Sequence, residues 1–155
     1  MFDIQKAPLH SSAIIPLPPG TAQDILRDPQ ALAGLLPELK VSVEPDKIIN
    51  AGSVIILGGI AVIKTIVLEV SEFDAATSQM NFTYHFTGGG GYIGSRIEAG
   101  ETADTSVFTI GFQPGSNKGL LFLRSPLGSV GKHMLHHELS GLGKRFERVH
   151  RKRED

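Results

Sequence analysis

The sequence predicts an α+β fold in which a curved antiparallel sheet of about six to seven strands wraps around a long C-terminal helix, with two short helices after the first strand. Two observations carry this prediction. The last third of the chain has apolar residues at helical spacing, and the segment from Val41 to Phe112 alternates with a period of two between glycine-rich turns.

The long helix is predicted from Pro126 to Arg151. Ser125 is a favourable N-cap, and proline is tolerated at the first helical position. At 1.5 Å per residue this helix would be about 39 Å long. The apolar side chains that share one face are Leu127, Val130, Met134, Leu135, Leu139, Leu142, Phe146 and Val149. A face of this length needs a broad apolar surface to pack against.

The N-terminal part predicts one strand and two short helices. Ser12–Leu17 has strand character, and Pro16 places it at the edge of the sheet because proline cannot donate to a neighbouring strand. Ala22–Arg27 is expected to form the first helix, with Thr21 as its cap. Asp28 is expected to cap the second helix, in which Pro29 occupies the first turn.

The middle of the chain predicts a meander of antiparallel strands, because consecutive strands are joined by short turns. The expected turns include Gly58–Gly59, Gly88–Gly91 and Gly100–Asp104. The expected strands are Val41–Ile49, in which Val41–Val43 and Lys47–Ile49 flank a kink at Pro45, and then Ser53–Leu57, Ala61–Phe73, Met80–Phe86, Tyr92–Glu98 and Ser106–Phe112. The sheet and the long helix each have one apolar face and must pack together. A twisted, curved sheet leaves a gap beside a straight helix.

Length and composition fit a single domain spanning residues 1–155. The chain has no cysteine, which excludes disulfides and thiol chemistry. No segment has the pattern of a signal peptide or of a membrane span, so we expect a cytoplasmic protein without a membrane span. Basic residues concentrate from Lys144 onward, where they favour the negative pole of the helix dipole; this interpretation is preferred to a nucleic-acid or lipid-headgroup patch.

This order of elements resembles the helix-grip fold of the START superfamily, also called SRPBCC. Within it, the chain is most similar to the CoxG-like family, named after a subunit of carbon monoxide dehydrogenase, and to the polyketide cyclases. The segments that carry the resemblance are Asp28-Pro29 followed by Leu35-Leu36-Pro37, Leu57-Gly58-Gly59-Ile60, the glycine cluster Gly88–Gly94, the Glu101–Val107 hairpin and the glycine-containing terminal helix.

The resemblance implies a cavity between helix and sheet that holds a hydrophobic or amphipathic small molecule. Members of the superfamily include carriers, sensors and a few enzymes. CoxG-like proteins are associated with a redox enzyme at the membrane, often through an apolar C-terminal anchor. The sequence Arg151–Asp155 is charged, so the anchor does not carry over to this chain.

Two patterns that suggest a cofactor or a metal are better explained by the fold. Gly89–Gly94 matches G-x-G-x-x-G, but no helix and no βαβ unit follows it, so no dinucleotide is expected. His133 and His137 share a helix face beside His136, yet the order of a zinc protease motif is missing. A solvated histidine-rich edge is favoured, and we expect neither metal nor cofactor.

Other function classes lack their signatures. The G-x-S-x-G motif of serine hydrolases does not occur, so no catalytic triad is predicted. The aromatic strands carry almost no lysine or arginine, which argues against nucleic-acid binding.

The predicted ligand-binding residues are those that project from the two apolar faces toward the gap. They are Lys64, Ile66, Leu68, Phe82, Tyr84, Phe86, Phe108, Ile110, Val130, Met134, Glu138 and Leu142. Lys64 and Arg145 are equally compatible with the cavity and with a position near its rim from which they extend to solvent. Glu138 lies in the middle of the predicted helix, where burial would raise its pKa unless a cation held it charged.

Three functions remain open from the sequence. The preferred one is non-enzymatic binding or carriage of a hydrophobic small molecule. The second is a cyclase or dehydratase that uses Glu138 with Lys64 or Tyr84 as acid and base. The third is an accessory protein that docks on a redox enzyme through the apolar run Leu120–Leu123.

Overall fold

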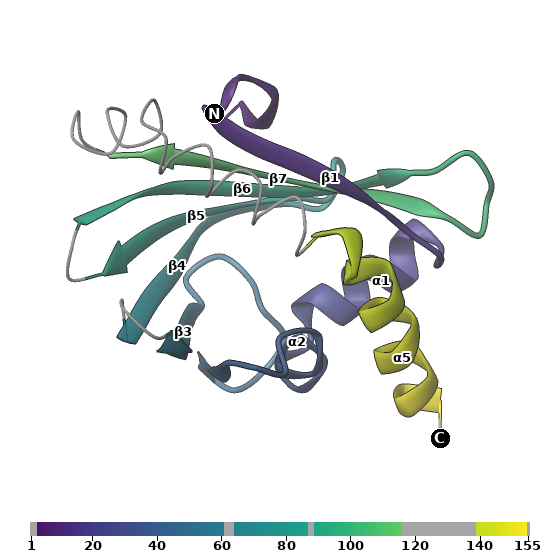
Figure 1. Cartoon of the computed structure of the whole chain (residues 1–155), viewed down its shortest axis with the longest axis horizontal. Coiled ribbons are helices and arrows are strands. Elements are labelled where there is room, and N and C mark those ends of the chain that lie inside the picture. Colours follow the sequence, from purple (N-terminus) through teal and green to yellow (C-terminus); the bar gives the residue numbers. More distant parts are fainter. Residues whose placement is uncertain (1–2, 61–63, 87–88, 116–138, 155) are drawn as a thin grey trace.

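The computed structural model describes residues 3–60, 64–86, 89–115 and 139–154 (Figure 1). The predicted α+β class with one antiparallel sheet and a C-terminal helix is confirmed. The elements are η1 (Ile4–Lys6), β1 (Leu9–Ile15), α1 (Pro19–Arg27), α2 (Pro29–Leu35), β2 (Lys40–Glu44), β3 (Val54–Ile60), β4 (Lys64–Asp74), β5 (Gln79–Phe86), β6 (Gly89–Ala99), β7 (Ser106–Pro114) and α5 (Leu142–Glu154).

Within the described ranges the sheet has seven strands in the order β1-β7-β6-β5-β4-β3-β2, and all pairs between them are antiparallel. Strands β2 to β7 form the predicted meander, and β1 returns to pair with β7. The edge position predicted for the first strand is therefore correct, although β1 begins at Leu9 and ends at Ile15, before Pro16. Figure 1 shows the strong twist of the sheet and places α1, α2 and α5 on one side of it.

The two short helices follow β1 as predicted. Asp28 caps α2, and its Oδ1 accepts a hydrogen bond of 3.0 Å from the backbone N–H of Gln30. The expected cap at Thr21 is wrong, because α1 already begins at Pro19. Proline fits the first helical position, where its missing N–H has no partner to lose.

Three predicted strand boundaries are wrong. Lys47–Ile49 is not a strand; the backbone of Ile49 bonds instead to Arg27 at the end of α1. Gly58–Gly59 does not turn the chain but lies inside β3, where Gly59 has a φ of 82° and the register with β4 shifts. Most of the predicted turn Gly88–Gly91 belongs to β6, which begins at Gly89.

A second irregularity decides which residues of β4 face the helices. The register with β5 shifts between Val70 and Glu72. Simple alternation from Leu68 and Val70 would turn Glu72 inward. The shift leaves Glu72 exposed and places Phe73 on the inner wall instead.

Only the end of the predicted C-terminal helix lies within the described residues. α5 begins at Leu142 and ends at Glu154, three residues beyond the predicted end. Gly141 forms a turn, so the expected helix is not continuous through it. Leu142, Phe146 and Val149 are buried on one face, as the periodicity predicts. The part predicted from residue 126 to 138 lies outside the described residues.

The core consists of two clusters at the end of the concave face that the helices cover. In the first, Phe146 of α5 is fully buried and its ring centroid lies 6.5 Å from that of Phe108 on β7. The second cluster joins Val43, Ile49, Ile55, Val70 and Met80. These clusters fix the three helices against the sheet and leave part of its concave face as a cavity wall.

The close contact between α5 and β1 predicts that a methyl group added at Gly143 would destabilise the fold. A Cβ at Gly143 would lie 2.7 Å from the backbone oxygen of Ile14, which is closer than packed atoms allow. We expect Gly143→Ala to lower the free energy of unfolding by about 1–3 kcal/mol. Urea denaturation followed by circular dichroism measures it. Gly20→Ala in α1 is the matched control, because nothing lies within 4 Å of that Cβ; equal losses in both variants would contradict the tight contact.

Candidate functional site

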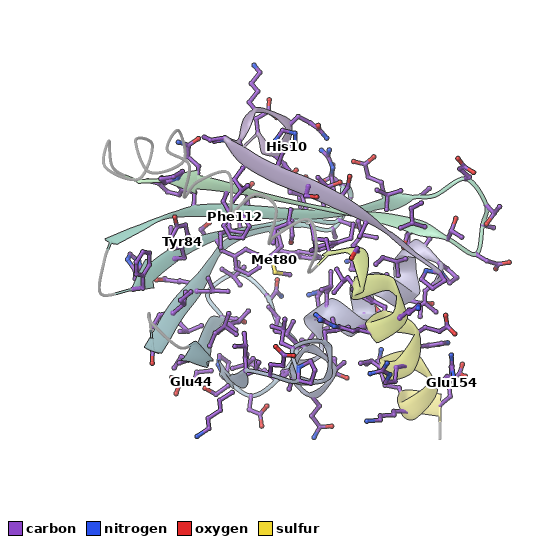
Figure 2. The ribbon with its side chains drawn as sticks, in the orientation of Figure 1. His10, Glu44, Met80, Tyr84, Phe112 and Glu154 are labelled. Atoms are coloured by element: carbon purple, nitrogen blue, oxygen red, sulfur yellow. The ribbon has the colours of Figure 1, made fainter. Side chains whose placement is uncertain are left out.

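A cavity of about 680 Å³ lies between the concave face of the sheet and the helices. Its wall is mainly apolar, with leucines from α1 and α2, and isoleucines and phenylalanines from the strands. Met80, Tyr84 and Phe112 come from the strands of this wall, and Figure 2 shows their positions on the helix-facing side of the sheet. The volume is in the range of ligand pockets, about 300–1,000 Å³. The gap expected between a curved sheet and straight helices is therefore present.

Eight of the twelve predicted ligand-binding residues line this cavity. They are Ile66, Leu68, Phe82, Tyr84, Phe86, Phe108, Ile110 and Leu142. The side chain of Lys64 and the residues Val130, Met134 and Glu138 lie outside what the structure describes. The structure also places Arg145 on the wall rather than only at a distant rim. Whether these residues contact a ligand stays a prediction.

Much of the wall was not predicted from the sequence. The missed residues include Leu26, Leu32, Leu35, Leu36 and Leu39 near α1 and α2, Ile55 and Leu57 of β3, Ile93, Ser95 and Ile97 of β6, and Phe112. The alternation of β3, β6 and β7 was a usable signal, because in each strand the residues at every second position face the cavity. The leucines of α2 carried no such signal, since helical periodicity does not distinguish a cavity wall from a solid core.

Polar groups on the wall gather near α1. The hydroxyl of Ser78 donates a hydrogen bond to Oε1 of Gln23, and both residues line the cavity. Arg27, one helical turn after Gln23, lines it as well, with its guanidinium carbon 4.1 Å from the centroid of the Phe73 ring. This end of the cavity therefore offers hydrogen-bond donors beside an apolar interior.

Tyr84 supplies a polar group on the sheet side of the cavity. Its ring is parallel to that of Phe86, with centroids 6.1 Å apart. Tyr84 pairs with Gly91 on β6, and a Cβ at that glycine would lie 2.9 Å from the tyrosine oxygen. Glycine at this position leaves room for the tyrosine hydroxyl. Burial raises the pKa of the Tyr84 phenol above its ordinary value of 10.0, so the hydroxyl is neutral at physiological pH.

The described residues show no metal centre. They contain no group of three or more histidine, cysteine, aspartate or glutamate side chains placed to hold an ion. His133, His136 and His137 lie outside the described residues, so the interpretation of that cluster stays a prediction. Among the helices in the described ranges, none has the length and apolar character needed to span a membrane.

Comparison with solved structures identifies the fold. The structure of TTHA0849 from Thermus thermophilus matches with a TM-score of 0.62 at 18% identity, over 91% of this chain and 97% of that one. Ara h 8.0201 matches with a TM-score of 0.61 at 14% identity, over 92% and 96% of the two chains. Truncated norcoclaurine synthase from Thalictrum flavum matches with a TM-score of 0.58 at 11% identity, over 86% and 91%.

These similarities confirm the helix-grip fold. At such low identity they show the fold alone. No family model matches the sequence, and no curated protein matches it significantly. The resemblance to CoxG-like proteins is not confirmed by these comparisons.

The buried environment of Tyr84 predicts that its phenol titrates at higher pH in the folded protein than in the unfolded one. The chain has two tyrosines and no tryptophan, so Tyr92→Phe leaves Tyr84 as the sole tyrosine. Its phenolate absorbance should then appear with a midpoint above pH 10 in the folded protein and near pH 10 in urea. The Tyr84 phenol has the lower pKa in the unfolded state and loses its proton there first. Deprotonation therefore favours the unfolded state, and the free energy of unfolding should fall as pH rises above about 10. Tyr84→Phe should remove this part of the pH dependence; identical midpoints in the two states would refute the assigned environment.

Proposed function

We propose that this protein binds or carries a hydrophobic or amphipathic small molecule in the cavity between its sheet and its helices. The observation that carries the proposal is the cavity itself, about 680 Å³ with walls made mainly of leucine, isoleucine and phenylalanine side chains. Transfer of an apolar molecule from water to such a wall is favourable at roughly 25 cal/mol per Å² of apolar surface. Packed protein interiors contain few voids larger than a water molecule, so a cavity of this size is not an ordinary packing defect.

Two related structures show that the fold accommodates small molecules. Norcoclaurine synthase from Thalictrum flavum, with a TM-score of 0.54, was solved in complex with dopamine and hydroxybenzaldehyde. A further structure of that enzyme holds a transition-state analogue. Similarity of fold at about this level supports a cavity protein and leaves the ligand of this chain to be identified by experiment.

The narrower functions remain proposals. An enzyme of the cyclase or dehydratase type would need an acid and a base in the cavity; of its predicted groups only the Tyr84 side chain is described, and it is neutral at physiological pH. A CoxG-like accessory role would place a redox enzyme against Leu120–Leu123, which lies outside the described residues. A cytoplasmic location also remains a prediction from the sequence.

A larger side chain in the cavity should weaken binding of an apolar probe. The neutral dye N-phenyl-1-naphthylamine fluoresces more strongly in an apolar site and reports occupancy. Ile66→Trp projects a larger side chain into the cavity and should weaken dye binding by about 10-fold or more. Thr65→Trp is the matched control, because Thr65 is the exposed neighbour on the opposite face of β4 and should leave the affinity unchanged.

Mass spectrometry of the protein purified under native conditions complements the titration. We expect a small apolar or amphipathic molecule that is present in wild type and depleted in Ile66→Trp. Failure of the dye to bind wild type, together with the absence of any such molecule, would reject the proposal. Equal binding by both tryptophan variants would place the dye outside the cavity.

A further inference from the structure

Arg27 lies where the interior cavity meets a second, charged cleft of about 440 Å³ on the surface. It lines both. The cleft is formed by the junction of α1 and α2, the segment from Asp46 to Ile48, and Arg153 of α5. A guanidinium at this place can therefore meet the polar end of a molecule whose apolar part occupies the interior cavity.

The position of the Arg27 side chain is fixed by its neighbours. Its Nε donates a hydrogen bond of 2.9 Å to the backbone oxygen of Ile49, and its guanidinium lies over the ring of Phe73. In return the N–H of Ile49 donates to the backbone oxygen of Arg27 over 2.8 Å. These contacts hold the guanidinium in place without occupying the donors of its two terminal nitrogens. A side chain that is already held in position loses little conformational entropy when a ligand binds.

The charge of Arg27 is not neutralised by a direct partner in the part of the chain that the structure describes. No carboxylate there lies within ion-pair distance of it. Asp24, Asp28 and Asp46 share its cleft with Lys47 and Arg153, so the cleft has as many acidic as basic side chains. Asp28 is already engaged by the N–H of Gln30 and by Arg153 at 3.6 Å.

Gln23 extends this donor set into the interior cavity. It precedes Arg27 by one helical turn, which places both side chains on the same face of α1. Its Oε1 accepts the hydroxyl of Ser78, so its amide nitrogen is left as a donor. Among the residues that the structure describes, the other charged side chains on the wall of this cavity are Glu38, which is exposed, and Arg145, which has an interaction of its own.

We propose that the ligand is an amphipathic carboxylate, whose carboxylate is held by the Arg27 guanidinium and the Gln23 amide and whose apolar chain fills the interior cavity. This inference rests on the proposed function. A planar guanidinium with two uncommitted nitrogens matches the two oxygens of a carboxylate, and hydrogen bonds between charged groups are about twice as strong as neutral ones. The apolar wall supplies affinity, and Arg27 selects the head group.

Two ligands of equal chain length test whether the protein selects a carboxylate head group. Dodecanoate and dodecan-1-ol differ in the head group, and each is titrated against bound N-phenyl-1-naphthylamine at neutral pH. Wild type should bind dodecanoate about 10- to 100-fold more tightly than dodecan-1-ol. Arg27→Gln should weaken dodecanoate and bring the two affinities close to each other. Lys47→Gln, which removes another cation of the same cleft, should retain the preference for dodecanoate.

A second variant is needed because Arg27 also holds Ile49. Gln23→Met removes the amide donor without touching that bond and should weaken dodecanoate several-fold while sparing dodecan-1-ol. Equal affinities of wild type for the two ligands would overturn the carboxylate site and leave the cavity function intact. An unchanged preference in Arg27→Gln would do the same. If neither ligand displaces the dye and Ile66→Trp has no effect, the proposed function fails together with this inference.

Discussion

The contact of α5 with the edge strand β1 determines where the cavity can lie. Gly143 has no side chain, so α5 approaches the backbone of Ile14 closely, and Phe146 is inserted fully between the helices and the sheet. A helix fixed at one edge cannot follow the curvature of a twisted sheet. The concave face beyond this contact is therefore left uncovered by α5, and its phenylalanines and isoleucines form a wall rather than a core.

The register of the sheet determines what that wall is made of. Two shifts, one near Gly59 in β3 and one between Val70 and Glu72 in β4, break the simple alternation of inward and outward residues. The second keeps a carboxylate out of the cavity and brings Phe73 in. Phe73 in turn supports the guanidinium of Arg27. The register shift in β4 thus places the ring that contacts Arg27 on the cavity wall.

The fold class followed from periodicity and turns, because these reflect local chemistry that tertiary contacts did not override. Met80, Phe82, Tyr84 and Phe86 all line the cavity, as alternation requires. The errors have a different origin. Gly58–Gly59 was expected to turn the chain. Glycine is typical both of turns and of β-bulges, and only the pairing of β3 with β2 and β4 shows that a bulge is formed here. The position of the Arg27 side chain depends on Ile49 and Phe73, which are distant in sequence, so no local pattern could indicate it.

An open sheet can pair with other chains along its edge strands, which are β1 and β2 in the part of the chain that the structure describes. Strand β2 carries exposed charges at both ends, Lys40 and Glu44, and is followed at once by Pro45. Strand β1 lies between Pro8 and Pro16, and α5 lies against its last residues. Charges and prolines at strand ends are the means by which natural proteins prevent edge-to-edge association. These features disfavour association through the edges of the sheet, whose concave face leaves an apolar cavity beside the helices.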